Sequence, residues 1–263
     1  MKIFRFNKKQ IKQPIPEWNR NWMEDAFRSM IKDFGEETIK QIKVLLPLQS
    51  DIPIQLPVSE NNVYQLVQLI ASQIGIDDRK IEILFIDKGV KVFNSETGYP
   101  IIAIPEKDET DFSGFYQGIN SNGKFVIGID IEQFKSIQLT IATIAHEMAH
   151  IVLSGIMQMK DYDEHFADLF TVYFGLGIFN ANSALQFYKT AYSWGYHKQG
   201  YLTQQEWGYA LALYASIRKE TNPVWVTYLT KDIKQEFDKS QRFINEALSE
   251  NWHLDEMTKL NEE

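Results

Sequence analysis

The chain has 263 residues, of which 44% are hydrophobic and 13% aromatic, enough for one domain with a sizeable core or two small ones. Its net charge is −8 at pH 7 and no contiguous basic face is evident, which argues against a nucleic-acid-binding surface. It contains no cysteine, so disulfides are excluded and a metal site would have to use histidines and carboxylates.

The N-terminal half predicts a mixture of helices and strands. Residues 1–10 are basic but lack the apolar stretch of a signal peptide, so we expect a cytoplasmic protein. Residues 17–46 are expected to be helical, with Trp22, Phe27, Ile31 and Phe34 among the apolar positions. The proline-containing stretch 46–57 indicates a strand or a connector.

A second helix and several strands are expected between residues 60 and 130. Apolar residues at helical spacing predict a helix that ends at Gly75: Val63, Leu66, Val67, Ile70 and Ile74. Short apolar runs at residues 81–86, 101–104 and 125–129 predict strands. We therefore expect a sheet that leads into the following helix.

Residues 137–153 predict that following helix, because they contain no glycine or proline and repeat apolar residues at helical spacing. Ser154 and Gly155 then indicate the end of the helix, with Gly155 able to adopt the left-handed conformation.

This helix carries the most informative motif of the chain, His146-Glu147-Met148-Ala149-His150. Residues four apart lie on one face of a helix, so both imidazoles can reach one metal ion while Glu147 lies beside it. Zinc with three protein ligands keeps a position for water, and an adjacent glutamate can accept a proton from that water. The alternative is a pair of histidines in a buried helix, which is costly without a partner such as a metal.

A further helix is predicted from about residue 161. It begins with acidic residues, as helix starts often do, and continues with an apolar stripe of Phe166, Leu169, Phe170, Tyr173 and Phe174. Glu164 and Asp168 lie one turn apart on the opposite face. An ordinary acidic helix start is the alternative explanation for this pair.

Together, His146-Glu147-x-x-His150 and the later Glu164 and Asp168 resemble the gluzincin metallopeptidases over residues 124–176. The resemblance implies one Zn²⁺ per chain held by His146, His150 and Glu164, with Glu147 as the general base. It also implies that Asp168 accepts a hydrogen bond from His146 and fixes its tautomer.

Three acidic or histidine residues near the motif are alternatives to members of this set or neighbours of them. Asp161 and Asp163 could replace Glu164 as the third ligand, as in aspartate-type zincins. His165 points to another side of its helix and is interpreted as a surface or packing residue. The metzincin pattern fails, because its glycine and third histidine would fall on Leu153 and Ile156.

The expected elements favour an α+β fold with an added C-terminal helical layer. The resemblance implies that its core is zincin-like, with a mixed sheet whose edge strand leads into the metal-binding helix. The edge strand would be residues 124–130, pairing with an extended peptide, although nothing in these residues excludes an ordinary sheet strand. We divide the chain into an N-terminal α/β portion (1–123), a zinc-site core (124–176) and a C-terminal helical portion (177–263).

The C-terminal part is expected to be helical. Residues 169–188 carry no charge but are too polar to span a membrane, and from Gly175 they indicate a helix end and a packed loop near the cleft. Thr203 and Glu206 fit a capping box at the start of a helix that lasts until residues 222–223. Another helix is expected over residues 224–248.

Gluzincins supply an additional donor to the oxyanion formed from the scissile carbonyl. The candidates here are Tyr196, His197 and Tyr201, in a segment bordered by Gly195 that could bend over a cleft. The alternative is that both tyrosines pack between helices and His197 faces solvent.

The sequence thus favours a zinc-dependent metallopeptidase that acts on a peptide or protein and binds neither nucleic acid nor membrane. The alternative from another class is a regulatory or interaction protein that retains a zinc-binding zincin core without catalysis. A third is a regulatory peptidase that cleaves one cellular repressor, whose DNA-binding part would then belong to the partner.

Overall fold

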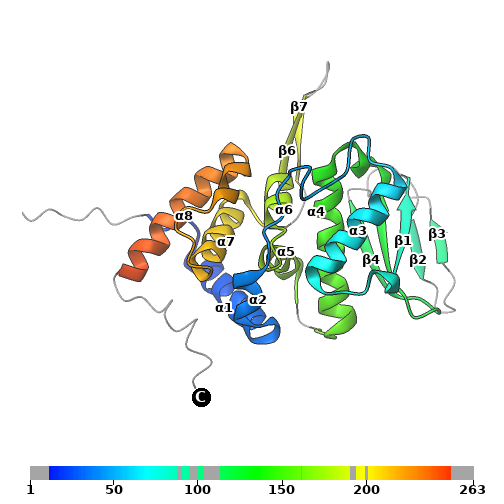
Figure 1. The fold of residues 1–263 in the computed structure, drawn as a ribbon, viewed down its shortest axis with the longest axis horizontal. Helices are drawn as coiled ribbons and strands as arrows, with labels where there is room; N and C mark the ends of the chain where they lie inside the picture. The colour runs from blue at the N-terminus through cyan, green and yellow to red at the C-terminus, as the bar shows by residue number, and fades with distance from the viewer. Residues whose placement is uncertain are drawn as a thin grey trace, which may run out of the picture.

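The structure is a computed structural model that describes residues 12–87, 91–94, 100–103, 113–160, 162–189, 194–198 and 201–249. It is an α+β fold, with a three-stranded mixed sheet on one side and a group of helices on the other (Figure 1). The candidate metal ligands and the candidate general base lie on helices between these two parts.

The N-terminal helices differ in one respect from the prediction. The expected helix over residues 17–46 is divided into α1 (Glu17–Phe34) and α2 (Glu36–Gln41), and residues 42–46 are not helical. Gly35 has a φ of 90°, which interrupts the helix between them. The next helix, α3 (Glu60–Ile74), ends at a left-handed Gly75 as predicted.

The sheet has the order β1–β5–β4, in which β1 (Ile81–Ile86) is parallel and β4 (Gly114–Ile119) antiparallel to β5 (Phe125–Asp130). All six residues of β5 are buried, as expected for a strand with neighbours on both sides. Of the two possibilities left open for this segment, the ordinary sheet strand is therefore correct. The edge position near α4 belongs instead to β4, whose register shifts between Tyr116 and Gly118.

A separate antiparallel pair consists of β2 (Lys91–Asn94) and β3 (Pro100–Ala103), the latter close to the predicted strand at residues 101–104. Short 3₁₀ turns, η1 (Asp78–Lys80) and η2 (Ile131–Lys135), precede β1 and follow β5.

Helix α4 (Ile137–His150) packs on the sheet beside α3, and one apolar core fills the space between them (Figure 1). The helix does not end at Gly155, because a π-helical turn, η3 (Ile151–Ile156), continues it. Gly155 serves another purpose: a Cβ there would lie 2.6 Å from the Tyr116 hydroxyl and 2.8 Å from the Phe125 ring. Strands β4 and β5 therefore approach the helix at a position where only glycine fits.

The combined helix Ile137–Ile156 is long and apolar enough to cross a membrane by length and composition, and 67% of its most apolar window is buried inside the protein. Packing against the sheet and the neighbouring helices accounts for this composition, since a central core helix has the same character.

Two short helices follow. Helix α5 (Glu164–Tyr173) begins at Asp163, whose carboxylate accepts a hydrogen bond from the Phe166 amide at 2.9 Å. The predicted helix end at Gly175 is present, with φ 73°. The packed loop expected after it is wrong: residues Gly177–Ser183 form the buried helix α6.

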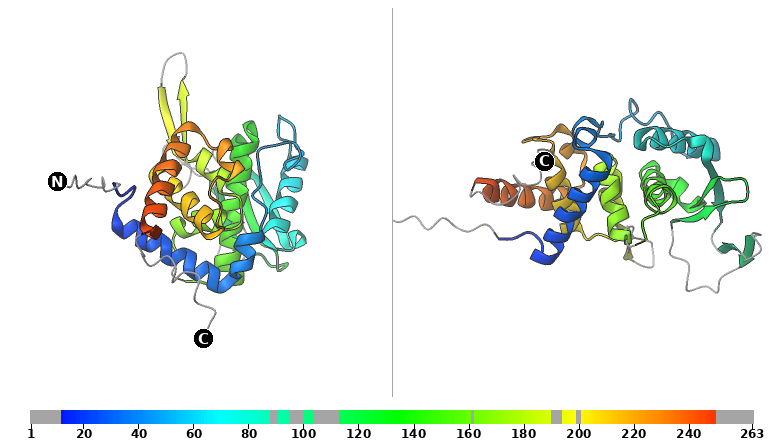
Figure 2. Two further views of the ribbon diagram at one scale, coloured as in Figure 1. Left: turned by 60° about the vertical axis from the view of Figure 1, so that its left-hand side comes forward. Right: turned by 90° about the horizontal axis from the view of Figure 1, so that it is seen from below.

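The segment after α6 is not entirely helical, contrary to the prediction. Strands β6 (Leu185–Lys189) and β7 (Trp194–Lys198) form an antiparallel hairpin that projects from the body (Figures 1 and 2). Their sequences, Leu-Gln-Phe-Tyr-Lys and Trp-Gly-Tyr-His-Lys, are rich in aromatic residues, which favour strands.

The C-terminal layer contains α7 (Gln204–Ile217), η4 (Val224–Tyr228) and α8 (Lys231–Ser249). The capping box predicted at Thr203 and Glu206 is present. The single helix expected over residues 224–248 is divided, because Asn182 bonds the Tyr228 carbonyl and the Thr230 amide, each at 2.8 Å. A second apolar core joins α7 and α8 to α1 and α5.

Candidate metal centre

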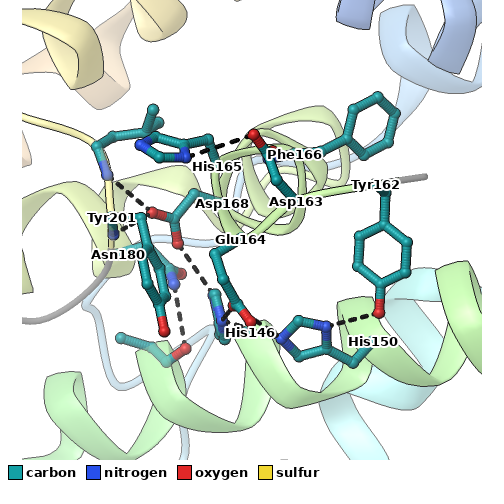
Figure 3. A network of polar contacts seen from close by, with 12 residues as sticks. His146, His150, Tyr162, Asp163, Glu164, His165, Phe166, Asp168, Asn180 and Tyr201 are labelled. Atoms are coloured by element: carbon teal, nitrogen blue, oxygen red, sulfur yellow. Dashed lines mark hydrogen bonds and ion pairs between the residues drawn. The ribbon is translucent and has the colours of Figure 1, made fainter. Parts of the chain in front are cut away.

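Helices α4 and α5 bring the candidate residues to one cleft. His146, Glu147 and His150 lie on α4. Glu164 and Asp168 project from α5 toward the two histidines (Figure 3). Because i and i+4 positions share one face of a helix, the two histidines point to the same place. The cleft measures about 810 Å³, and strand β4 contributes Gly114, Phe115 and Tyr116 to its wall.

Three side chains in this cleft could hold a metal ion. His146 Nε2 lies 3.0 Å from Glu164 Oε2 and 3.2 Å from His150 Nε2, and His150 Nε2 lies 3.1 Å from the same carboxylate oxygen. Tetrahedral zinc with bonds of about 2.0–2.1 Å separates its ligand atoms by about 3.3 Å. The donor set therefore fits a small divalent ion, and two imidazoles with one carboxylate suit zinc.

The electrostatic field at these atoms favours a cation. Burial alone would lower the pKa of His146, but hydrogen bonds with Asp168 and Glu164 outweigh it and raise this pKa to about 10. Hydrogen bonds with His146 and His150 hold the pKa of Glu164 far below its usual range. The carboxylates around His146 therefore favour a positive charge at this position.

Glu147 is 5% exposed and lines the cleft next to the three donor residues. Burial raises the pKa of its carboxyl group, while the positive charge of His146 opposes the rise. A carboxylate with a raised pKa is a stronger base, which suits proton transfer near neutral pH. Gly114 of β4 approaches it so closely that a Cβ there would lie 3.0 Å from Glu147 Oε1.

Asp168 is fully buried and uses both carboxylate oxygens. Oδ1 lies 3.0 Å from His146 Nδ1, the nitrogen that faces away from the donor group. Oδ2 accepts hydrogen bonds from the backbone amides of Tyr201 at 2.7 Å and Leu202 at 3.1 Å. One side chain thus contacts a candidate metal ligand and the chain segment that leads into α7.

The Nδ1 atom of His150, like that of His146, has a hydrogen-bonding partner. This nitrogen lies 2.8 Å from the hydroxyl of Tyr162, in the connection between η3 and α5. The Ser154 hydroxyl hydrogen-bonds the same phenol, and burial raises the pKa of Tyr162, so the phenol is neutral. Sequence reasoning missed this tyrosine, since no spacing rule relates a residue in a connecting segment to a histidine on the preceding helix.

The three candidate oxyanion donors lie in different parts of the structure. Tyr201 lines the cleft, and its ring stacks on His146 with 6.0 Å between ring centroids (Figure 3). Tyr196 and His197 fall on β7, and their side chains lie outside the described residues. The structure therefore places one of the three near the donor group.

One of the two rival acidic ligands, Asp163, and the neighbouring His165 lie within the described residues. Asp161 lies outside the described residues. Asp163 is the cap of α5, 59% exposed in its side chain, and contacts His165 at 3.6 Å. The His165 ring packs edge-on against Trp22, with 6.0 Å between centroids. Neither Asp163 nor His165 belongs to the donor group that the described residues form.

Comparison with known proteins gives no match to a family model, to a curated protein or to a solved structure. What can be said of this site therefore depends on its own residues and their geometry.

Proposed function

We propose that the protein is a zinc-dependent metallopeptidase of the gluzincin type, with a peptide or protein as its substrate. The observation that carries the proposal is the donor group His146, His150 and Glu164, with atoms 3.0–3.2 Å apart, next to the buried carboxylate of Glu147. Structural zinc usually has four protein ligands, whereas three ligands and an adjacent glutamate are typical of catalytic sites.

The ion, when bound to these three residues, would act as a Lewis acid on water and on the scissile carbonyl. Glu147 accepts a proton from the attacking water as the new carbon–oxygen bond forms. It then delivers this proton to the amide nitrogen as the carbon–nitrogen bond breaks, which yields a carboxylic acid and an amine. Tyr201, beside His146, is our candidate donor to the oxyanion.

The substrate would lie along β4. This strand pairs with β5 on one side only among the described strands, and its first residues line the cleft. An extended peptide could form backbone hydrogen bonds along such an edge, which explains how a polypeptide would be held without a particular sequence.

Replacing Glu147 by Gln tests this function. The amide cannot accept a proton, so we expect Glu147→Gln to retain zinc and fold while its hydrolysis of a peptide library falls about 10²-fold or more. Glu60→Gln is the matched control, because Glu60 lies in the first turn of α3, outside the cleft.

Two outcomes would contradict the proposal. If the wild-type protein and Glu147→Gln both hold zinc and are equally inactive on broad peptide libraries, the non-catalytic regulatory protein becomes the better description. If the wild-type protein binds no zinc, the assignment of the metal ligands is wrong as well.

A further inference from the structure

The two histidines of the donor group differ in the partner of Nδ1, the ring nitrogen that faces away from the candidate metal position. His146 Nδ1 contacts the carboxyl group of Asp168, whereas His150 Nδ1 contacts the phenol of Tyr162 (Figure 3). The rings of His150 and Tyr162 are tilted by 43° with centroids 5.7 Å apart. At this tilt and separation the two rings are not stacked face to face, and the hydrogen bond joins His150 Nδ1 to the phenol.

The contact matters because a neutral imidazole carries its single N–H on one of two nitrogens. A histidine can bind a metal through Nε2 only if the hydrogen is on Nδ1, and an acceptor next to Nδ1 selects that form. The phenol oxygen of Tyr162 has lone pairs for this purpose, and Ser154 provides the phenol with a second hydrogen-bonding partner.

We propose that Tyr162 is a positioning residue of the metal site, whose phenol oxygen accepts the Nδ1 hydrogen of His150 and keeps Nε2 available and directed at the ion. The proposal rests on the metal-binding part of the proposed function and not on hydrolysis. It assigns a role to the connection between η3 and α5, which leads directly into Glu164.

The chain path supports this role. Tyr162 lies two residues before Glu164, so one short segment places both the carboxylate donor and the support of His150. The π-helical turn η3 directs the chain from α4 into this segment and carries Ser154. Both histidines of α4 are therefore oriented by groups that come from the α5 side of the cleft, one by Asp168 and the other by Tyr162.

The test is the zinc affinity of Tyr162→Phe, measured by competitive titration with a chelator. Phenylalanine keeps the ring and its packing but removes the hydroxyl, so we expect zinc affinity to fall about 10-fold, the lower end for partners of metal-bound histidines. The lower end is appropriate because a hydrogen bond to a neutral phenol is weaker than one to a carboxylate. Tyr64→Phe, on the exposed face of α3, is the matched control.

Two further measurements separate positioning from a purely structural role. The visible absorption of the cobalt-substituted protein should change in Tyr162→Phe, because the spectrum depends on ligand geometry. The urea midpoint of the metal-free variant should match that of the wild type. Should Tyr162→Phe fail to fold, Ser154→Ala keeps the phenol and removes its second partner, and a two- to threefold loss of zinc affinity is expected there.

The proposal is overturned if Tyr162→Phe binds zinc as tightly as the wild type with an unchanged cobalt spectrum. It is also overturned if the loss of zinc affinity is accompanied by an equal loss of stability in the metal-free protein. A wild-type protein that binds no zinc would overturn both this proposal and the proposed function, whereas intact zinc binding in all variants overturns this one alone.

Discussion

The substitution Asp168→Asn is expected to weaken zinc binding strongly while changing the shape of the side chain hardly at all. Asp168 accepts three hydrogen bonds: one involves His146 Nδ1, and two come from the amides of Tyr201 and Leu202. Asparagine has one acceptor oxygen and one donor group in the same positions. It cannot satisfy all three contacts, so either the contact with His146 or the two contacts with the backbone amides must be lost.

The magnitude follows from comparing the two orientations of the new amide. If the NH₂ group faces the two backbone amides, two buried donors lose their acceptor, at about 1–3 kcal/mol each. If it faces His146 instead, Nδ1 must become an acceptor and the ring hydrogen moves to Nε2, which blocks the metal-binding nitrogen. The second orientation costs the metal-free protein less, so we expect zinc affinity to fall about 100-fold, or about 2.8 kcal/mol at 1.4 kcal/mol per tenfold change.

A competitive chelator titration measures this change, and circular dichroism of the metal-free proteins checks that the fold is kept. Asp163→Asn makes the same chemical change five residues earlier, where the carboxylate caps α5 and is exposed. Asparagine caps helices as well as aspartate does, so this control should bind zinc normally. The reasoning is refuted if Asp168→Asn folds normally and binds zinc as tightly as Asp163→Asn.

Three other predictions concern the ligands, the wall of the cleft and the fold. Alanine at any of the three donor residues should sharply lower zinc content, measured by elemental analysis, and unchanged content in all three variants would remove the site. Gly114→Ala should retain zinc but lose peptidase activity about 10-fold or more, since its Cβ would lie 2.6 Å from Thr143 and 3.0 Å from Glu147; normal turnover would contradict the close approach. Burial alone would raise the pKa of Asp51, but its hydrogen bond with Lys43 helps to lower it. A lowered folded-state pKa adds stability above the ordinary value of about 4 and loses it as the pH falls. The free energy of unfolding of Asp51→Asn, measured with urea, should thus be about 1–2 kcal/mol lower than that of the wild type at pH 7. If this difference between the two proteins stays constant down to pH 3, the lowered pKa of Asp51 is not its cause.

Local patterns in the sequence predicted the parts of the site that lie on regular helices. Helical spacing places His146 and His150 on one face, and the capping box at Thr203 depends on residues only three positions apart. The α+β class and the sheet leading into α4 follow from the same periodicities. These features need no knowledge of how distant segments meet.

The features that were missed depend on tertiary contacts. Gly155 has the signature of a helix end, yet it is required because Tyr116 and Phe125 come close to the helix. The second oxygen of Asp168 binds an amide 33 residues away, and Tyr162 reaches His150 only through the path of its connecting segment. The position of β5 in the centre of the sheet likewise depends on its partners and not on its own residues.

The shift in register on β4 also limits what this strand can pair with. Edge strands are prone to pair with a second copy of the same chain, and bulges are one means by which proteins prevent it. Here Gly118, with φ 99°, follows the shift and the strand ends at the exposed Ile119. The shift separates Gly114–Tyr116, at the cleft, from Gly118 and Ile119. The uninterrupted stretch at the cleft is therefore about 10 Å long at 3.4 Å per residue. A second copy of this protein therefore finds only a short regular edge to pair with at this strand.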